Sequence, residues 1–225
     1  MNKAIISGDI IAFTALSDKN KQILETKIQE LFLVISKKYA VFCRMVKGDY
    51  IECVVENPEY AFEIALLIKS FLKSLPIQEK NNNRFKYFKS HAIRLAVAIG
   101  YLNRYDKERG IIDGEAIYMS GRKINQESTH DKKRIVVKNT LFFVSKNTSL
   151  NKQFQTIFTL VDFILFKATS KQCEVAYYKI LGYKEKEIAQ ILHISQPVVN
   201  QHSLSVGWNA LEQAIKHFRE TVKTI

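Results

Sequence analysis

Two short runs rich in apolar and β-branched residues, joined by a tight-turn sequence, constrain the fold of this chain most. The runs are Ala40–Val46 and Tyr50–Val55, and Lys47-Gly48-Asp49 lies between them. Glycine next to an aspartate is typical of a hairpin turn, because both residue types tolerate the left-handed backbone conformation that such turns use. The sequence therefore predicts two antiparallel strands joined at this turn.

Strand-like and helix-like segments alternate on both sides of the hairpin. Apolar runs predict strands, and apolar residues three or four positions apart predict amphipathic helices. In chain order, the predicted elements are a strand at Lys3–Gly8, a helix at Asp18–Lys38, the hairpin, a helix at Pro58–Leu75 and a strand at Ala92–Gly100. This β-α-β-β-α-β order matches the ferredoxin-like split βαβ arrangement, and it predicts an antiparallel sheet with helices on one face.

The rest of the chain predicts a change from α+β to all-α structure. The expected elements are a polar loop at Gln78–Lys89, a helix at Asp113–Gln126, a short strand at Arg134–Val137 and an apolar helix at Leu150–Ala168, with only helices after it. The apolar helix has no predicted strand beside it, so we expect it to connect two modules or to form a dimer contact. The expected domains are an α+β domain at 1–148, a connecting helix at 149–170 and an all-α domain at 171–225.

The C-terminal region contains two short helical patterns joined by a tight turn. A helix is predicted at Lys184–Leu192, and a second one begins after Ser195, a favourable cap, with Pro197 in its first turn. Helices at Lys171–Leu181 and Leu204–Val222 would flank this pair. The residues expected to face inward are Ile188, Ala189, Leu192, at least one of Val198 and Val199, and the stripe Trp208, Leu211 and Ile215.

The second helix of this pair has the polar residues expected of a DNA reader. Ser195, Gln196, Asn200, Gln201 and Ser203 can form hydrogen bonds with base edges in a major groove. The segment resembles the helix-turn-helix of bacterial regulators and of sigma-factor region 4, which implies that DNA is a partner. The alternative is a helical bundle that contacts only protein.

The distribution of charge limits how strongly one copy would bind DNA. The formal net charge is +12, yet residues 171–225 contain seven Lys and Arg against five Asp and Glu. Phosphate contacts dominate DNA affinity. We therefore expect a homodimer, or a contribution from basic residues of the N-terminal domain.

Two aspartates in strand-to-turn positions predict a second site. Asp9 follows the first apolar run and Asp49 lies in the hairpin turn, and two such carboxylates could hold a divalent cation against a triphosphate. The sequence Ser7-Gly8-Asp9-Ile10-Ile11-Ala12-Phe13-Thr14 resembles the first metal motif of class III nucleotide cyclases, and Gly48-Asp49 resembles the second. The resemblance implies that Asp9, Asp49 and the carbonyl of Ile10 bind Mg²⁺ or Mn²⁺, with Phe13, Thr14 and Gly48 near the nucleotide.

A third cyclase motif is similar to Gly114–Arg122, and it departs from the family pattern. Arg122 matches the transition-state arginine of that family, whereas Tyr118 replaces an asparagine. By the same alignment Met45 and Ile111 occupy the base-selecting positions, where an apolar pair cannot read a purine edge. The metal half of a cyclase site is therefore expected, without the usual base reading.

The whole chain is similar to the SatD-like family of bacterial proteins. The motifs that carry this resemblance are Ser7–Ile10, Gly48-Asp49, Gly114–Ile117 after the strand ending at Gly100, and Gly182–His202 followed by Trp208. The resemblance implies a nucleotide-cyclase-like α+β domain followed by a helix-turn-helix domain. It implies little about activity, because the biochemical role of that family is poorly defined.

Structural roles remain open for each candidate site residue. Asp9 could cap the turn at Ile10–Ala15, Asp49 could serve only the hairpin turn, and Arg122 could be a solvated helix residue. The three cysteines are expected to be reduced, buried thiols, and the five histidines lack the spacing of zinc ligands.

We expect a cytoplasmic DNA-binding regulator whose first domain senses a nucleotide or dimerises. No signal-peptide pattern or long apolar run predicts a membrane span. The alternatives are an active noncanonical nucleotide cyclase or phosphoryl-transfer enzyme with an accessory helix-turn-helix, and a scaffold in which both aspartates are relics of the fold.

Overall fold

A five-stranded mixed sheet forms the centre of the computed structural model, which describes residues 2–79, 83–128 and 137–224. Its strand order is β2-β3-β1-β4-β7, and β3 pairs antiparallel with both β1 and β2. β4 is antiparallel to β1, whereas β7 is parallel to β4. The strands are β1 (Lys3–Ile10), β2 (Val41–Val46), β3 (Tyr50–Val55), β4 (Ile93–Gly100) and β7 (Leu141–Ser145), and a separate pair consists of β5 (Leu102–Asp106) and β6 (Ile111–Gly114).

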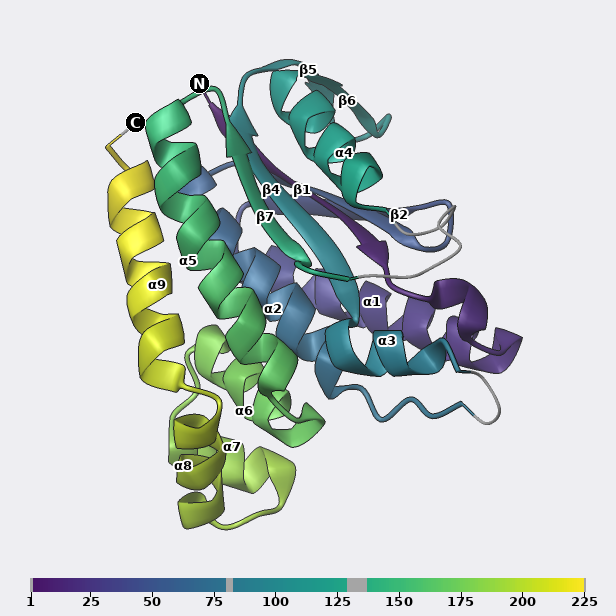
Figure 1. Ribbon diagram of the computed structural model, residues 1–225, viewed down its shortest axis with the longest axis vertical. Helices are drawn as coiled ribbons and strands as arrows, with labels where there is room; N and C mark the ends of the chain where they lie inside the picture. The colour runs from purple at the N-terminus through teal and green to yellow at the C-terminus, as the bar shows by residue number, and fades with distance from the viewer. Residues whose placement is uncertain (1, 80–82, 129–136, 225) are drawn as a thin grey trace.

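Helices cover both faces of the sheet (Figure 1). The α-helices are α1 (Asp18–Lys38), α2 (Ala61–Ser74), α3 (Phe85–His91), α4 (Glu115–Glu127), α5 (Thr148–Lys167), α6 (Ser170–Leu181), α7 (Glu185–Leu192), α8 (Gln196–Ser205) and α9 (Trp208–Val222), with single 3-10 turns η1 (Phe13–Ala15) and η2 (Pro58–Tyr60). Ala4, Ile6 and Ile10 of β1 belong to the core that contains α1, α2 and α5, while Ile5 packs with Ala116 of α4. The expectation of helices on one face is therefore wrong, because α4 covers the opposite face.

The predicted hairpin is confirmed. Val46 and Tyr50 pair across its end, and Lys47 and Gly48 have φ angles of 57° and 75°. This backbone conformation favours glycine, which explains the turn sequence.

Other predicted elements differ in their limits. The expected loop at Gln78–Lys89 is wrong in its second half, because α3 starts at Phe85. Strands β5, β6 and β7 were not predicted, and the helix predicted from Asp113 begins only at Glu115, after β6. Most of the predicted strand at Arg134–Val137 lies outside the described residues, and Val137 itself is not in a strand.

The apolar helix α5 packs on the sheet rather than standing apart from it. Its Phe154 and Phe158 are fully buried and contact Phe143 of β7 at ring-centroid distances of 5.0 and 5.7 Å. The expectation that this helix has no strand neighbour is wrong, because β7 was missed in the sequence.

The last helix returns to the same core, where it completes an aromatic cluster of five rings. Phe218 of α9 lies 4.8 Å from Phe154 and 5.4 Å from Phe62 of α2, and Phe62 stacks on Phe158 at 4.3 Å. In Figure 1, α9 runs alongside α5. One hydrophobic core thus joins residues from the first and last quarters of the chain.

The long helix predicted at Leu204–Val222 is interrupted. Gly207 has a φ angle of 68°, which ends α8 and redirects the chain into α9. Leu211 and Ile215 are buried as predicted, and they face the main core.

A buried polar network holds α2, β4 and α5 together. The ammonium of Lys69 donates to the carbonyl of Ile93 at 3.0 Å and lies 3.2 Å from Asp162 Oδ1 of α5. Asp162 also accepts a hydrogen bond from the hydroxyl of Thr140 at 2.7 Å. These partners offset the cost of burying both charges.

Within residues 2–79, 83–128 and 137–224, no helix has the length and apolar character needed to cross a bilayer.

Because Phe218 fills the centre of the shared core, Phe218→Ala should lower the free energy of unfolding by about 3–5 kcal/mol. The unfolding transition should remain single when urea denaturation is followed by circular dichroism. Leu160→Ala, at a side chain that is 61% exposed, is the control and should change stability by less than about 0.5 kcal/mol. A second, independent transition for the C-terminal helices would contradict the shared core.

Candidate functional site

A pocket of about 460 Å³ lies where β1 ends beside the β2–β3 hairpin. It contains both predicted aspartates, Asp9 and Asp49. Its lining residues are Asp9, Val46, Lys47, Asp49, Tyr50, Glu52, Ile124, Asn125 and Ser128. The sheet supplies the first six and α4 or the residue after it supplies the rest, so the pocket is formed between the sheet and α4.

The strand register brings the two aspartates to the same pocket. Asp9 pairs with Tyr50 of β3, and the amide of Ile10 donates to the carbonyl of Asp49 at 2.8 Å. Asp9 therefore lies directly beside the hairpin turn, which contains Asp49.

The carboxylate of Asp9 forms an ion pair with Arg94 that sequence reasoning missed. Arg94 Nη1 lies 2.6 Å from Asp9 Oδ2, and the two residues are only 1% and 5% exposed. They face each other because Asp9 and Arg94 are direct partners in the β1–β4 register. The sequence signal that could have predicted this ion pair is Arg94 itself, the one charged residue in the otherwise apolar strand β4.

A second guanidinium neutralises another carboxylate of the pocket. Arg44 donates from Nε and Nη2 to Glu52 Oε2 at 2.9 and 2.5 Å, and its Nη1 donates to the carbonyl of Gly110. Such fork-shaped contacts hold a carboxylate firmly. The carboxylates of Asp9 and Glu52 are therefore both paired with arginine.

Tyr50 supplies a hydroxyl group to the lining of the pocket. Burial raises the pKa of Tyr50, and its hydrogen bond with Ser7 acts in the opposite direction. Behind it, the buried Oγ atoms of Ser7 and Ser120 are 2.7 Å apart. The Tyr50 hydroxyl can donate to or accept from a polar ligand without any change in charge.

The ion pair with Arg94 opposes a Mg²⁺ or Mn²⁺ ion at Asp9, the first of the predicted metal ligands. A divalent cation on Asp9 would lie beside the positive guanidinium of Arg94, where repulsion opposes binding. Among the described residues, no group of three or more His, Cys, Asp and Glu side chains is arranged to hold a metal ion. The roles of Asp9, Ile10 and Asp49 as metal ligands stay predictions.

Two of the predicted nucleotide-binding residues lie near the hairpin turn. A Cβ atom at Gly48 would be 3.9 Å from the ring of Phe13, so these two residues are neighbours. Thr14 is exposed. Phe13, Thr14 and Gly48 are not among the residues that line the pocket.

The structure does not bring the other cyclase-motif residues into this pocket. Met45 packs against the core on the other face of the sheet from Asp9, and Ile111 begins β6. Tyr118 and Arg122 are exposed on α4, where the Tyr118 hydroxyl donates to Asp113 Oδ1 at 2.5 Å. The α4 residues that line the pocket are Ile124 and Asn125, which the motif alignment did not indicate.

Helices α6, α7 and α8 form a small three-helix unit with its own apolar centre. Val175 of α6, Ile188 and Ala189 of α7, and Val199 of α8 pack together. His193 has a φ angle of 53° and ends α7, and α8 begins three residues later, directly after Ser195. The predicted end of the first helix at Leu192, the start of the second after Ser195, and the inward position of Ile188 and Ala189 are confirmed.

Most of the predicted reading residues are exposed on α8. Ser195, Gln196, Asn200 and Gln201 are exposed, whereas Ser203 is only 4% exposed. Ser203 lies one helical turn after the buried Val199 and so shares its inward face. The expectation that Ser203 is on the polar outer face is wrong.

Comparisons with known proteins give distant structural matches only. No family model matches the chain, and no curated protein matches it. Two structures of a bacterial light-regulated adenylyl cyclase are 19% identical, with TM-scores of 0.46 and 0.45; the matches cover 69% and 64% of this chain, and 79% and 43% of those chains. The GGEEF domain of a diguanylate cyclase from Vibrio cholerae is 19% identical with a TM-score of 0.42, over 66% of this chain and 85% of that one.

The buried pair predicts a large effect of removing only its cation. Arg94→Met leaves the carboxylate of Asp9 buried without the guanidinium, which should lower the free energy of unfolding by about 3–5 kcal/mol. Asp9→Asn in the same background should recover part of this loss, because it removes the buried negative charge that faced Arg94. Urea denaturation at neutral pH measures both effects.

Arg122→Met is the matched control for this experiment, because Arg122 is exposed on the helix that covers the pocket. Its effect should stay within about 0.5 kcal/mol. An equal loss in Arg94→Met and Arg122→Met would show that the ion pair is not what stabilises this region.

Proposed function

We propose that this protein is a cytoplasmic, homodimeric DNA-binding regulator. Its helix-turn-helix would read DNA through α8, and its N-terminal α+β domain would sense a ligand or form the dimer. The observation that carries this proposal is the division of α8 into two faces. Val199 and Ser203 anchor the helix, while the amides of Gln196, Asn200 and Gln201 point away from the protein.

The arrangement of these amides suits a major groove. Gln196 and Asn200 are four residues apart and therefore lie on the same side of α8. An α-helix fits the major groove, and Asn and Gln side chains can bond adenine through two hydrogen bonds. In proteins with this motif, residues near the start of the second helix contact the bases, as Ser195 and Gln196 would here.

The charges near α8 support a dimer rather than a single copy. α8 contains no Lys or Arg, and the exposed lysines that precede it, Lys184 and Lys186, lie at the start of α7. Phosphate contacts supply most of the affinity for DNA. Two copies would double these contacts and would recognise two half-sites.

The N-terminal domain has the strand order that supports a ferredoxin-like, nucleotide-cyclase-like assignment. β3 lies between β1 and β2 and is antiparallel to both, as the split βαβ arrangement requires. The SatD-like motifs described in the sequence belong to the same proposal.

A binding role suits this domain better than cyclisation. The ion pair of Asp9 with Arg94 opposes a metal there, and Met45 and Arg122 lie outside the pocket. We therefore assign the domain a role in sensing or dimerisation, and the active cyclase stays the alternative. Incubation with each nucleoside triphosphate and Mn²⁺, followed by product analysis, would identify cyclase activity.

The DNA-binding proposal predicts which side chains determine sequence preference. Binding sites are first selected with the full-length protein from a random DNA library. Gln201→Ala and Asn200→Ala should each weaken binding to the selected site about ten-fold, as expected for one base contact of ~1–3 kcal/mol. Fluorescence anisotropy at fixed salt measures the affinities.

Gln213→Ala, at an exposed amide on α9, is the matched control and should leave the affinity unchanged. Failure to select any sequence, or equal losses in the control and the α8 variants, would sink the proposal.

A further inference from the structure

A second pocket, unrelated to the aspartates, lies between α3, the loop that follows α2, and the start of α6. Its volume is about 650 Å³, within the range of small-molecule sites. An adjoining hollow of about 520 Å³ shares Lys73, Lys89 and Ser170 with it. We call the two together the α3 groove.

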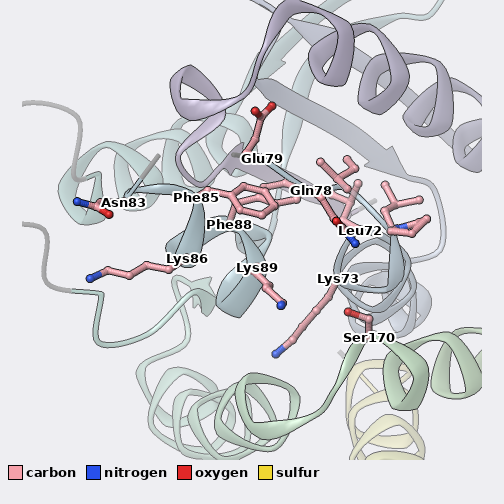
Figure 2. Close-up of a pocket in the computed structure, with 13 residues that line it drawn as sticks. Leu72, Lys73, Gln78, Glu79, Asn83, Phe85, Lys86, Phe88, Lys89 and Ser170 are labelled. Atoms are coloured by element: carbon pink, nitrogen blue, oxygen red, sulfur yellow. The ribbon is translucent and has the colours of Figure 1, made fainter. Parts of the chain in front are cut away.

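One part of the α3 groove is apolar and aromatic. Phe85 and Phe88 stack with their ring centroids 5.8 Å apart, and Phe85 is half-buried while Phe88 is buried. Figure 2 shows both rings at the centre of the view. The remaining apolar lining residues are Leu72, Leu75, Pro76 and Ile77. A flat or apolar group can lie against this surface.

The other part of the α3 groove is basic. In Figure 2, Lys89 of α3 and Lys73 of α2 lie on the side of the rings nearer to Ser170, and Lys86 extends away from them. Lys89 and Lys86 are exposed, so their ammonium groups can reach a ligand. Lys73 is buried and donates to the carbonyls of Leu165 and Phe166 at the end of α5, which fixes its charge beside the groove.

The carboxylate that lines the α3 groove is already engaged. Glu79 Oε1 accepts hydrogen bonds from the amide of Ser17 at 2.5 Å and from Asn20 Nδ2 at 2.7 Å. Glu79 therefore serves the start of α1. The described lining residues of the two hollows include one carboxylate, that of Glu79, and four lysines, which are Lys73, Lys86, Lys89 and Lys171.

We propose that the α3 groove binds a small organic phosphate that carries a flat or apolar group. The apolar group lies on Phe85, and the phosphate lies between Lys89 and Ser170. Both parts contribute, so a ligand that has both should bind more tightly than either part alone.

Adenosine monophosphate is a suitable probe because it combines a ring and a phosphate. Calorimetric titration of the full-length protein should show saturable binding of this probe. Adenosine alone and inorganic phosphate alone should each bind at least about ten-fold more weakly, because each lacks one set of contacts.

The double variant Lys86→Gln/Lys89→Gln should weaken the probe about ten-fold, since it removes the charge-assisted contact of Lys89 and lowers the positive charge of the groove. Both side chains are exposed, so the variant should fold, as an unchanged thermal midpoint would confirm. Lys152→Gln, an exposed lysine on α5 outside both hollows, is the matched control and should bind normally.

Phe85→Leu keeps an apolar floor but removes the ring, so it should weaken adenosine monophosphate and leave inorganic phosphate unchanged. Inorganic phosphate that binds as tightly as the probe, in all variants, would mean an adventitious ion only and would overturn the proposal. Absence of saturable binding, or equal affinities in the double variant and the wild type, would overturn it as well. None of these outcomes depends on DNA binding.

Discussion

The packing of one aromatic cluster decides how the chain is organised. Phe62, Phe143, Phe154, Phe158 and Phe218 come from α2, β7, α5 and α9, and they meet in one buried volume. Burying a large ring releases water from a large apolar surface, so each contributes strongly to the stability of the whole. Without α9, the rings of this core that contact Phe218 would be exposed to water. The proposed sensing domain and the proposed DNA-binding helices are therefore parts of one folded unit.

The buried ion pair changes the meaning of the aspartate motifs. A motif reports which residue types follow one another, whereas ligand binding depends on which groups surround a side chain in space. Asp9 meets Arg94 from a strand that lies 85 positions later in the chain. The guanidinium of Arg94 supplies the positive charge beside Asp9 that a metal ion would otherwise provide. Unlike a metal ion, it is part of the chain and cannot dissociate.

Local patterns predicted the hairpin and the two short C-terminal helices. Their determinants are close in sequence: Gly48 for the turn, Ser195 and Pro197 for the start of α8, and apolar residues at helical spacing. The misses have a different cause. β7 is a short apolar run that periodicity cannot distinguish from part of a helix, and without it α5 appeared to lack a partner. The positions of Met45 and Arg122 outside the pocket, and the pairing of Asp9 with Arg94, depend on sheet register and on the face that α4 covers.

The position of α9 also bears on how such a protein can evolve. The helix that follows α8 has Phe218 and Leu211 buried in the core that contains the sheet. If recombination moved only α6 to α9 into another gene, those side chains would be exposed in the new protein. The protein left without α9 would have a cavity in its core. The two halves are therefore expected to be inherited together.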